Sequence, residues 1–482
     1  MPNKYDVVIG LEIHCQVKTE SKMFCGCANS FGDEPNTNVC PICMGYPGAM
    51  PVPNKEAVRM TIISGLMCGC EIPKYSKFDR KSYFYPDMAK NYQISQFDLP
   101  FCVEGLIKVS GEGFSGKTIP ERYIKMERIH LEEDAGKLTH FGRSGGVDYN
   151  RAGVALMEAV SHPDMHTPDE AYAYLQAVKE IFQYAGAGDC DMEKGQLRCD
   201  VNVSLKPKGQ VELGTKIEIK NMNSFRGVHR ALNHEIKRIA RLLDDGVVLK
   251  QETRGWHDDK GESYLMRTKE AAHDYRYFPE PDLMPFTFTE EQIEKYRSEL
   301  PELPAAKRAR YVADYELSEL DVRILTSDKT TADYFDAGVT FTKTPKNLAN
   351  WIITELLREL GERDQTIGGC SVDAKRLAEM VELINNKTIS SKIAKTVLAE
   401  MFNSDKGPMV IVEEQGLVQV TDDSAIEGFV DQAIADNQPQ VQQYKDGNER
   451  VVQFFVGQVM QLSKGKANPP MVLDILKKKL SD

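Results

Sequence analysis

Hydrophobic and polar residues alternate along the first stretch of the chain, residues 5–17. A period of two over this length predicts a β-strand with one buried face, formed by Val7, Ile9, Leu11, Ile13 and Cys15. Glu12 and His14 then project from the opposite face, one pleat apart. A carboxylate and an imidazole on a rigid strand could share a cation or a proton. An exposed strand face is the simpler explanation of these two residues taken alone.

Later strand-like segments carry further polar groups. Residues 122–130 alternate and lead into three adjacent carboxylates, and residues 155–160 contain Glu158. Each acidic group alone would be a solvated charge. Held beside Glu12 and His14, they would form an oxygen-rich site suited to magnesium and a nucleotide.

Two more segments have continuous polar faces, which we interpret as the lining of a cleft rather than as plain surface. One face holds Arg198, Asp200, Asn202 and Ser204, and the other holds Lys216, Glu218 and Lys220. The basic, aromatic segment 76–87 could bring Arg80 and Lys81 to a phosphate. An aromatic turn over the core explains that segment equally well.

Helical periodicity replaces the alternation from about residue 290. We expect helices at 305–325, 371–384, 388–402, 424–436, 449–463 and 470–480, with a Gly-Pro break at 407–408. Near the end, Lys464 and Lys466 precede Lys477, Lys478 and Lys479. These lysines could bind a phosphate backbone, although the last three also suit the dipole of a helix C-terminus.

Composition narrows the protein class. The 482 residues are 41% hydrophobic and 27% charged, without an apolar run long enough to span a bilayer, so we expect no membrane segment. The net charge of −12 argues against a general nucleic-acid coat but permits a nucleic-acid substrate bound at local patches. A strand that begins by Tyr5 leaves no room for a signal peptide, so we expect a cytoplasmic protein.

Two close cysteine pairs have the spacing of a zinc site. Cys25 and Cys27 are followed by the Cys-Pro-Ile-Cys turn that contains Cys40 and Cys43. Four thiolates at this spacing predict a closed, structural Zn²⁺ site, and four buried thiols are the alternative. Residues 111–118 match a P-loop letter for letter, but Pro120 and an alternating segment follow where the P-loop needs a helix. We interpret that stretch as a turn between strands.

Long motifs resemble one protein family, the B subunits of glutamyl/aspartyl-tRNA amidotransferases (the GatB/GatE family). An example is His130-Leu-Glu-Glu-Asp-Ala-Gly-Lys137, and the others lie at residues 10–14, 78–87, 92–98, 197–202, 220–225, 274–282, 389–395 and 463–469. The resemblance implies an α+β protein in three parts. A cradle-shaped catalytic domain built on an antiparallel sheet would take residues 1–293, with the zinc loop at 25–43. A helical domain, 294–407, and a helical YqeY-like, tRNA-binding tail, 408–482, would follow.

The resemblance also implies an activity. Such a protein uses ATP and Mg²⁺ to phosphorylate the side-chain carboxylate of Glu-tRNA(Gln), Asp-tRNA(Asn) or both. Ammonia, which the amidase partner of the family (its A subunit) releases from glutamine, then displaces phosphate, and a small C subunit completes a heterotrimer. Ser390, Ser391 and Lys392 have the composition of an amidase triad but lack its glycine-rich setting, so we expect the ammonia to come from the partner. The competing hypothesis is a non-catalytic, zinc-containing tRNA-binding module.

Site residues follow from the same resemblance. The magnesium ligands would be Glu12, His14, Glu133 and Glu158, and the zinc ligands Cys25, Cys27, Cys40 and Cys43. Lys81 would lie on the phosphates and Asp200 would be a further catalytic residue in the cleft. Arg80, Arg198 and Lys220 would bind nucleotide or substrate, and Lys464 and Lys466 would bind tRNA.

Overall fold

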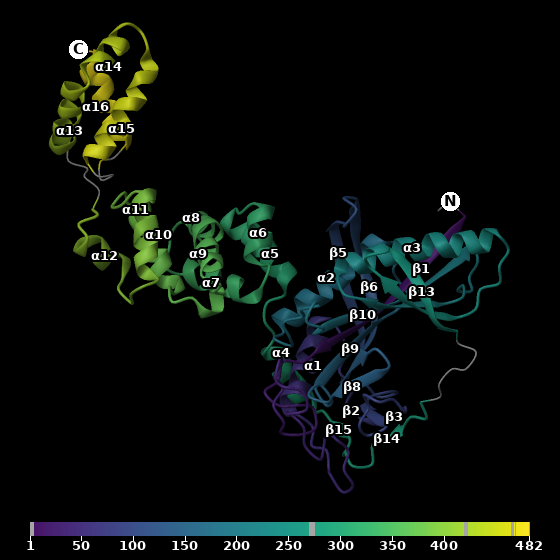
Figure 1. Ribbon diagram of the computed structural model, residues 1–482. Helices are drawn as coiled ribbons and strands as arrows, with labels where there is room; N and C mark the ends of the chain where they lie inside the picture. The colour runs from purple at the N-terminus through teal and green to yellow at the C-terminus, as the bar shows by residue number, and fades with distance from the viewer. Residues whose placement is uncertain (1–3, 269–274, 419–422, 464–466, 468, 482) are drawn as a thin grey trace. The chain divides into compact units, whose positions relative to one another are not determined.

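The computed structural model describes residues 4–268, 275–418, 423–463, 467 and 469–481. The chain divides into two compact units, residues 1–304 and 305–482, and Figure 1 shows strands with helices in the first and helices in the second. The predicted tail residues Lys464 and Lys466 lie outside the described residues.

An eight-stranded sheet forms the centre of the first unit. Its strands, in spatial order, are β13 (Glu262–Thr268), β12 (Glu252–His257), β11 (Ile217–Met222), β10 (Leu197–Pro207), β1 (Tyr5–Gln16), β9 (Ala155–Ser161), β6 (Thr118–Glu133) and β5 (Cys102–Glu112). All neighbours are antiparallel except β11 and β12, which are parallel. The first segment of the chain therefore lies in the middle of the sheet.

The alternation of the sequence separates the two faces of this sheet. Ile9, Leu11 and Ile13 are at most 1% exposed and pack into one hydrophobic core. That core also contains residues of four helices, α1 (Lys55–Met67), α2 (Pro168–Tyr184), α3 (Phe225–Asp244) and α4 (Glu290–Ser298). Figure 1 shows α2 and α3 on one side of the sheet. The polar residues of the strands are thereby left to the opposite face.

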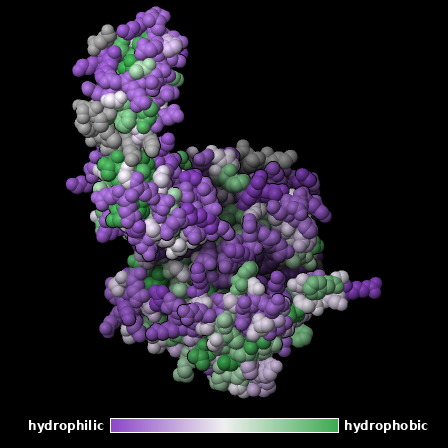
Figure 2. Space-filling view, turned by 60° about the vertical axis from the view of Figure 1, so that its left-hand side comes forward, coloured by the Kyte–Doolittle hydropathy of each residue, from purple (hydrophilic) through white to green (hydrophobic). Residues whose placement is uncertain are grey.

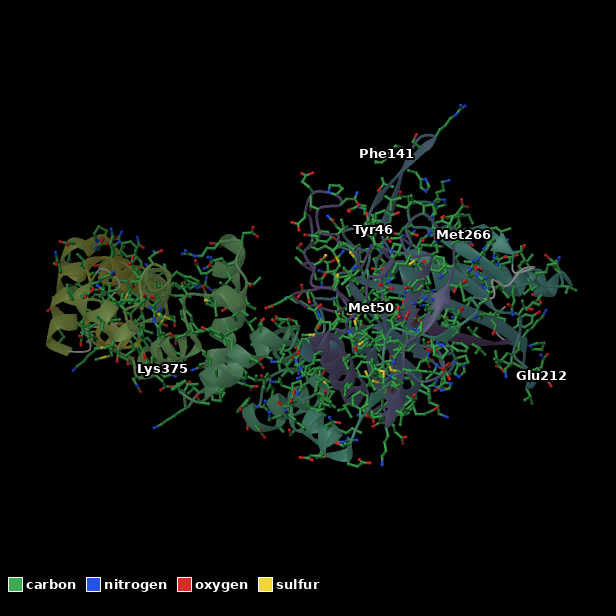
Figure 3. All side chains as sticks on the ribbon, turned by 90° about the horizontal axis from the view of Figure 1, so that it is seen from below. Tyr46, Met50, Phe141, Glu212, Met266 and Lys375 are labelled. Carbon is green, nitrogen blue, oxygen red and sulfur yellow. The ribbon has the colours of Figure 1, made fainter. Side chains whose placement is uncertain are left out.

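Short sheets accompany the large one. β14 (Phe278–Pro279), β3 (Asp79–Ser82) and β4 (Tyr92–Ser95) form one, and β4 packs against β6. β15 (Phe286–Thr287) pairs with β2 (Tyr75–Ser76), near α4 (Glu290–Ser298) in sequence. β7 (Lys137–Phe141) and β8 (Ser144–Asp148) make a hairpin, at whose outer end Figure 3 shows Phe141.

The P-loop-like stretch is the turn between β5 and β6. The backbone N–H of Gly113 donates to the carbonyl oxygen of Lys117 at 2.8 Å, and β6 begins at Thr118. Because a strand and not a helix follows Lys117, no helix N-terminus is available there to hold a phosphate. The prediction of a turn is confirmed.

Helices build the second unit around two hydrophobic clusters. The first cluster runs from Tyr311 to Val412 and the second from Ile426 to Leu480. The helices are α5 (Pro304–Tyr315), α6 (Glu319–Leu325), α7 (Lys329–Val339), α8 (Pro345–Trp351), the π-helix Ile352–Leu356, α9 (Leu357–Glu362), the 3₁₀ turn Ile367–Gly369, α10 (Ala374–Asn385), α11 (Ser391–Met401), α12 (Pro408–Glu414), α13 (Asp423–Asp436), α14 (Gln438–Lys445), the 3₁₀ turn Glu449–Val451, α15 (Val452–Leu462) and α16 (Pro469–Ser481). The segment 305–325 is two helices because Glu316, with φ +52°, interrupts it.

The predicted fold class is confirmed: a mixed α+β unit with a mainly antiparallel sheet precedes a helical one. The boundaries at 293 and 407 stay predictions. Among the described residues, the helices are too short or too polar to cross a membrane. The face of the molecule in Figure 2 is mostly hydrophilic, with hydrophobic residues in separate patches.

Candidate active site

One polar row crosses four neighbouring strands of the large sheet. His14 on β1 lies opposite Arg198 on β10 and opposite Glu158 on β9, and Glu158 lies opposite His130 on β6. Directly opposite residues of antiparallel strands share a face, with Cβ atoms roughly 5 Å apart. The register of the sheet therefore brings together groups that are far apart in the sequence.

His14, Glu132 and Glu158 form the first compact group, with ligand atoms that all lie within 4.8 Å of one another. His14 Nε2 is 3.2 Å from Glu158 Oε2, and His130 Nε2 approaches the same oxygen at 3.4 Å. Glu132 is 2% exposed and accepts a hydrogen bond of 2.9 Å from Ser95 Oγ. Two nearly buried carboxylates so close together call for positive charge between or beside them.

Neighbouring cationic groups supply this positive charge. Burial by itself would raise the pKa of Glu158, but His130 and His14 together hold it well below its usual range. Burial would likewise lower the pKa of Lys81, yet Glu132 and Glu158 raise it overall, so Lys81 stays an ammonium. Its Nζ lies 5.3 Å from the ring centre of Tyr275. Lys81 thus supplies a cation beside the first group.

A second group lies on the same polar face and consists of Glu12, Asp200 and Glu218, again within 4.8 Å. Asp200 lies opposite Glu12 across β10 and β1. Lys220 forms ion pairs with Asp200 and, at 3.2 Å, with Glu218. These carboxylates raise the pKa of Lys220 against the opposing effect of burial. Glu12 also accepts a hydrogen bond of 2.8 Å from Asn202 Nδ2.

A cavity of about 390 Å³ opens over this face. Five of the predicted site residues line it, namely His14, Lys81, Arg198, Asp200 and Lys220. The remaining lining residues include Tyr83, Asp87, Gln93, Glu132, Asp134, Arg151 and Asn223. A larger cavity of about 930 Å³ shares Arg151, Arg198 and Asn223 with it and also contains Lys18, Lys137 and Lys194. The two cavities therefore lie next to each other and share part of their lining.

The structure does not bring Glu133 into either group. Its carboxylate pairs with Lys90 and accepts the backbone N–H of Ile94 at 2.9 Å. Successive residues of a strand point to opposite faces, so Glu132 faces the cavity and Glu133 faces away. Glu132 takes the place in the group that the sequence analysis assigned to its neighbour.

Arg80 is also absent from the residues that line the cavity. Its guanidinium forms a two-point ion pair with the buried carboxylate of Glu280, with distances of 2.7 and 2.9 Å. It also stacks at 4.3 Å on the ring of Tyr92. Arg80 therefore joins β3 to the residue that follows β14, whereas its neighbour Lys81 lines the cavity.

Sequence reasoning missed Glu132, His130 and Asp134 as individual site residues. The alternation of side chains along a strand could have indicated two of them, because His130 and Glu132 lie on the same face of β6. Choosing that face over the other required the register of β6 on β9, which pairs His130 with Glu158. Asp134 follows the end of the strand and binds Arg198 at 3.0 Å.

The four predicted cysteine ligands do come together. The Sγ atoms of Cys25, Cys27, Cys40 and Cys43 lie within 4.8 Å of one another. The backbone N–H of Cys40 donates to Cys43 Sγ at 3.2 Å, as the predicted turn requires. The fully buried Lys22 places its Nζ 3.9 Å from the same sulfur.

Comparison with known proteins agrees with this architecture. The GatB/GatE catalytic domain matches residues 7–294, and the GatB domain matches residues 333–480. The chain belongs to the GatB/GatE family. It is 50% identical over 479 residues to the B subunit of the aspartyl/glutamyl-tRNA(Asn/Gln) amidotransferase of Thermoanaerobacter sp. (strain X514), covering 99% of this chain and all of that one. It is 48% identical to the same protein of Carboxydothermus hydrogenoformans and 49% identical to that of Brevibacillus brevis, covering 99% of each chain.

Within this GatB/GatE chain, the donor sets fit the metals that the resemblance implies. Both groups on the sheet are rich in carboxylate oxygens, which Mg²⁺ prefers, and the first adds one imidazole. The cysteine group offers four sulfurs at a separation compatible with tetrahedral Zn²⁺. The two regions thus differ in their donor atoms, which are mainly carboxylate oxygens on the sheet and sulfurs in the cysteine group.

Proposed function

We propose that this chain is the B subunit of an ATP-dependent tRNA amidotransferase. It would convert Glu-tRNA(Gln), Asp-tRNA(Asn) or both to Gln-tRNA(Gln) and Asn-tRNA(Asn). The observation that carries the proposal is the cavity that joins the His14–Glu132–Glu158 group to Lys81, Arg198 and Lys220. The names of the relatives, which match over nearly the whole chain, give the substrate class.

The chemistry explains why such a cavity is needed. Ammonia cannot displace an oxide from a carboxylate, so the carboxylate must first receive a leaving group. Its oxygen attacks the γ-phosphorus of ATP, the bond to ADP breaks, and an acyl phosphate forms. The nitrogen of ammonia then attacks the acyl carbon, the C–O bond to phosphate breaks, and the amide loses its extra proton to solvent or phosphate. Phosphoryl transfer of this kind depends on positioning and charge stabilisation rather than on a protein nucleophile.

The residues of the cavity can supply this positioning and charge stabilisation. Lys81, Arg198 and Lys220 present positive charge to the phosphates. We assign His14, Glu132 and Glu158 to one magnesium site and Glu12, Asp200 and Glu218 to a second. Magnesium, when bound, neutralises phosphate charge. Glu133 is replaced in this ligand set, and Arg80 is retained only as a positioning residue.

Outside the cavity, we assign Cys25, Cys27, Cys40 and Cys43 to structural zinc. We keep the proposed division into a catalytic part, a helical domain and a tRNA-binding tail at 293 and 407. The larger cavity, with its lysines, supports the entry of a nucleic-acid end.

Partner proteins complete the proposed enzyme. Ser390 caps α11, because its Oγ accepts the backbone N–H of Ile393 at 3.3 Å. A helix cap explains Ser390 without amidase chemistry, which supports an external ammonia source in the amidase partner, with the small C subunit beside it. The reaction then belongs in the cytoplasm, where aminoacyl-tRNA is made.

A reconstituted assembly of the three proteins tests the proposal. Each misacylated tRNA is supplied in turn with ATP, Mg²⁺ and glutamine, and ADP and amidated aminoacyl-tRNA are measured. We expect ADP formation that depends on at least one of the two misacylated tRNAs. Binding of tRNA without ADP or amide formation would instead favour the non-catalytic tRNA-binding module.

A further inference from the structure

The carboxylates that line the 390 Å³ cavity differ in whether they have a hydrogen-bond or ion-pair partner. Glu132 accepts a hydrogen bond from Ser95, Asp134 pairs with Arg198, and Asp200 pairs with Lys220. Asp87 differs from them. Its Oδ1 is buried and has no hydrogen-bond partner among the described residues. Asp87 also forms no ion pair with any of those residues. A carboxylate oxygen that is buried without a partner is costly, so Asp87 is a candidate to bind a ligand in the cavity.

The backbone holds Asp87 firmly in this position. Its carbonyl oxygen accepts the N–H of Gly136 at 2.9 Å, and a Cβ at Gly136 would lie only 3.1 Å from that oxygen. Burial raises the pKa of the Asp87 carboxyl, and the nearby Asp134 raises it further. The backbone N–H of Asp87 and the charge of Arg151 lower this pKa and so oppose the rise. The backbone at Asp87 is therefore held in place, and the protein balances the negative charge of its side chain only in part.

The surroundings of Asp87 do not fit a metal ion. Among the described residues, the groups able to hold a metal are the cysteine group and the two groups of the sheet, and Asp87 belongs to none of them. A single carboxylate is a poor site for a divalent cation but a good acceptor for an ammonium group. Tyr83 lines the same cavity and offers an aromatic ring that can also favour a cation.

We propose that Asp87 binds the α-ammonium group of the aminoacyl residue on the misacylated tRNA. This inference rests on the proposed function, because the aminoacyl ester is its substrate. An α-amino group has a pKa of about 8, so it is mostly cationic at neutral pH. A glutamyl residue with an acylated α-nitrogen, as in peptidyl-tRNA, lacks that charge. Asp87 is thus a specificity-determining residue that admits free aminoacyl esters and rejects N-acylated ones.

A substrate–protein cycle tests this assignment in the reconstituted assembly of the three proteins. Wild type and Asp87→Asn are each assayed for amidation of Glu-tRNA(Gln) and of N-acetylglutamyl-tRNA(Gln), or of the aspartyl pair where that is the substrate. We expect wild type to prefer the free amine in kcat/KM by about 10- to 100-fold, the range of a hydrogen bond between charged groups. In Asp87→Asn the preference should fall to nearly one, through loss of activity on the free amine.

The ratio is taken on one preparation, so a partly unfolded variant does not alter it. Glu212→Gln, an exposed change that Figure 3 places at the outside of the molecule, should keep the wild-type ratio. If Asp87→Asn has no measurable turnover, equilibrium binding of the two tRNAs decides, and equal affinities support the assignment. A wild-type preference retained by Asp87→Asn overturns it.

The two proposals fail in different ways. Wild type that amidates Glu-tRNA and N-acetylglutamyl-tRNA equally well overturns the role of Asp87 and leaves the proposed function standing. Wild type that amidates no misacylated tRNA overturns the proposed function itself.

Discussion

The cysteine group and the His14–Glu132–Glu158 group are both candidate metal sites, but they are built in different ways. All four cysteines come from one stretch of 19 residues, Cys25–Cys43, and lie on loops. The other group takes one residue from each of β1, β6 and β9, which are brought together by strand pairing. The first is thus local in sequence and the second depends on the whole sheet.

This difference explains which of the predicted groupings of side chains the structure brings together. A four-thiolate site depends on short spacings that the sequence displays directly. A site on a sheet depends on which face each strand presents, and a shift of one residue reverses that face. Glu132 and Glu133 are adjacent in sequence, yet the first lies in the candidate site and the second pairs with Lys90.

The largest expected effect separates those two glutamates. Glu132→Gln removes a charge from the proposed magnesium site, so we expect kcat/KM for amidation to fall about 10³-fold, as when a preorganised electrostatic group is lost. Its melting temperature should change little. Glu133→Gln should instead destabilise the catalytic unit by about 3–5 kcal/mol, because it leaves the buried Lys90 without its partner. Steady-state amidation and thermal unfolding measure the two effects.

Each of these two variants serves as the control for the other. Both remove one carboxylate from the same strand end. If Glu133→Gln were the catalytically dead but stable variant, and Glu132→Gln the unstable active one, the assignment of faces would be reversed and the sequence-based ligand set restored.

The next effect concerns the local site. Cys40→Ser combined with Cys43→Ser removes half of the thiolates, so we expect loss of bound zinc and a lower melting temperature. Metal analysis of the purified protein and thermal unfolding check this. Cys68→Ser combined with Cys70→Ser is the matched control, because that buried pair belongs to no metal-binding group among the described residues and should leave the zinc content unchanged.

A smaller effect is expected at Lys22, which links the cysteine group to its surroundings. Its ammonium donates to the carbonyl oxygen of Asn38 at 2.7 Å and to that of Tyr149 at 3.3 Å. Lys22→Met keeps the apolar stem but removes these donors and the charge near Cys43. We expect zinc affinity to fall about 10-fold, measured by competition with a chelator, as for other outer partners of metal ligands. An unchanged affinity would make Lys22 a packing residue only.

The smallest effect is expected at Lys117. It is exposed in the turn between β5 and β6, so Lys117→Ala should leave amidation within about twofold of wild type. A large loss in the same steady-state assay would revive a phosphate-binding role for this turn.

The sequence alone determined the kinds of elements and the local motifs. The alternation at residues 5–17 follows from the geometry of one strand, and the cysteine spacing follows from the geometry of one turn. Both can be read without knowing what lies next to them. The separation of Lys81 from Arg80, and of Glu132 from Glu133, was decided only by the tertiary structure. Strand pairing sets which face is covered by helices and which is open, and no short stretch of sequence contains that information.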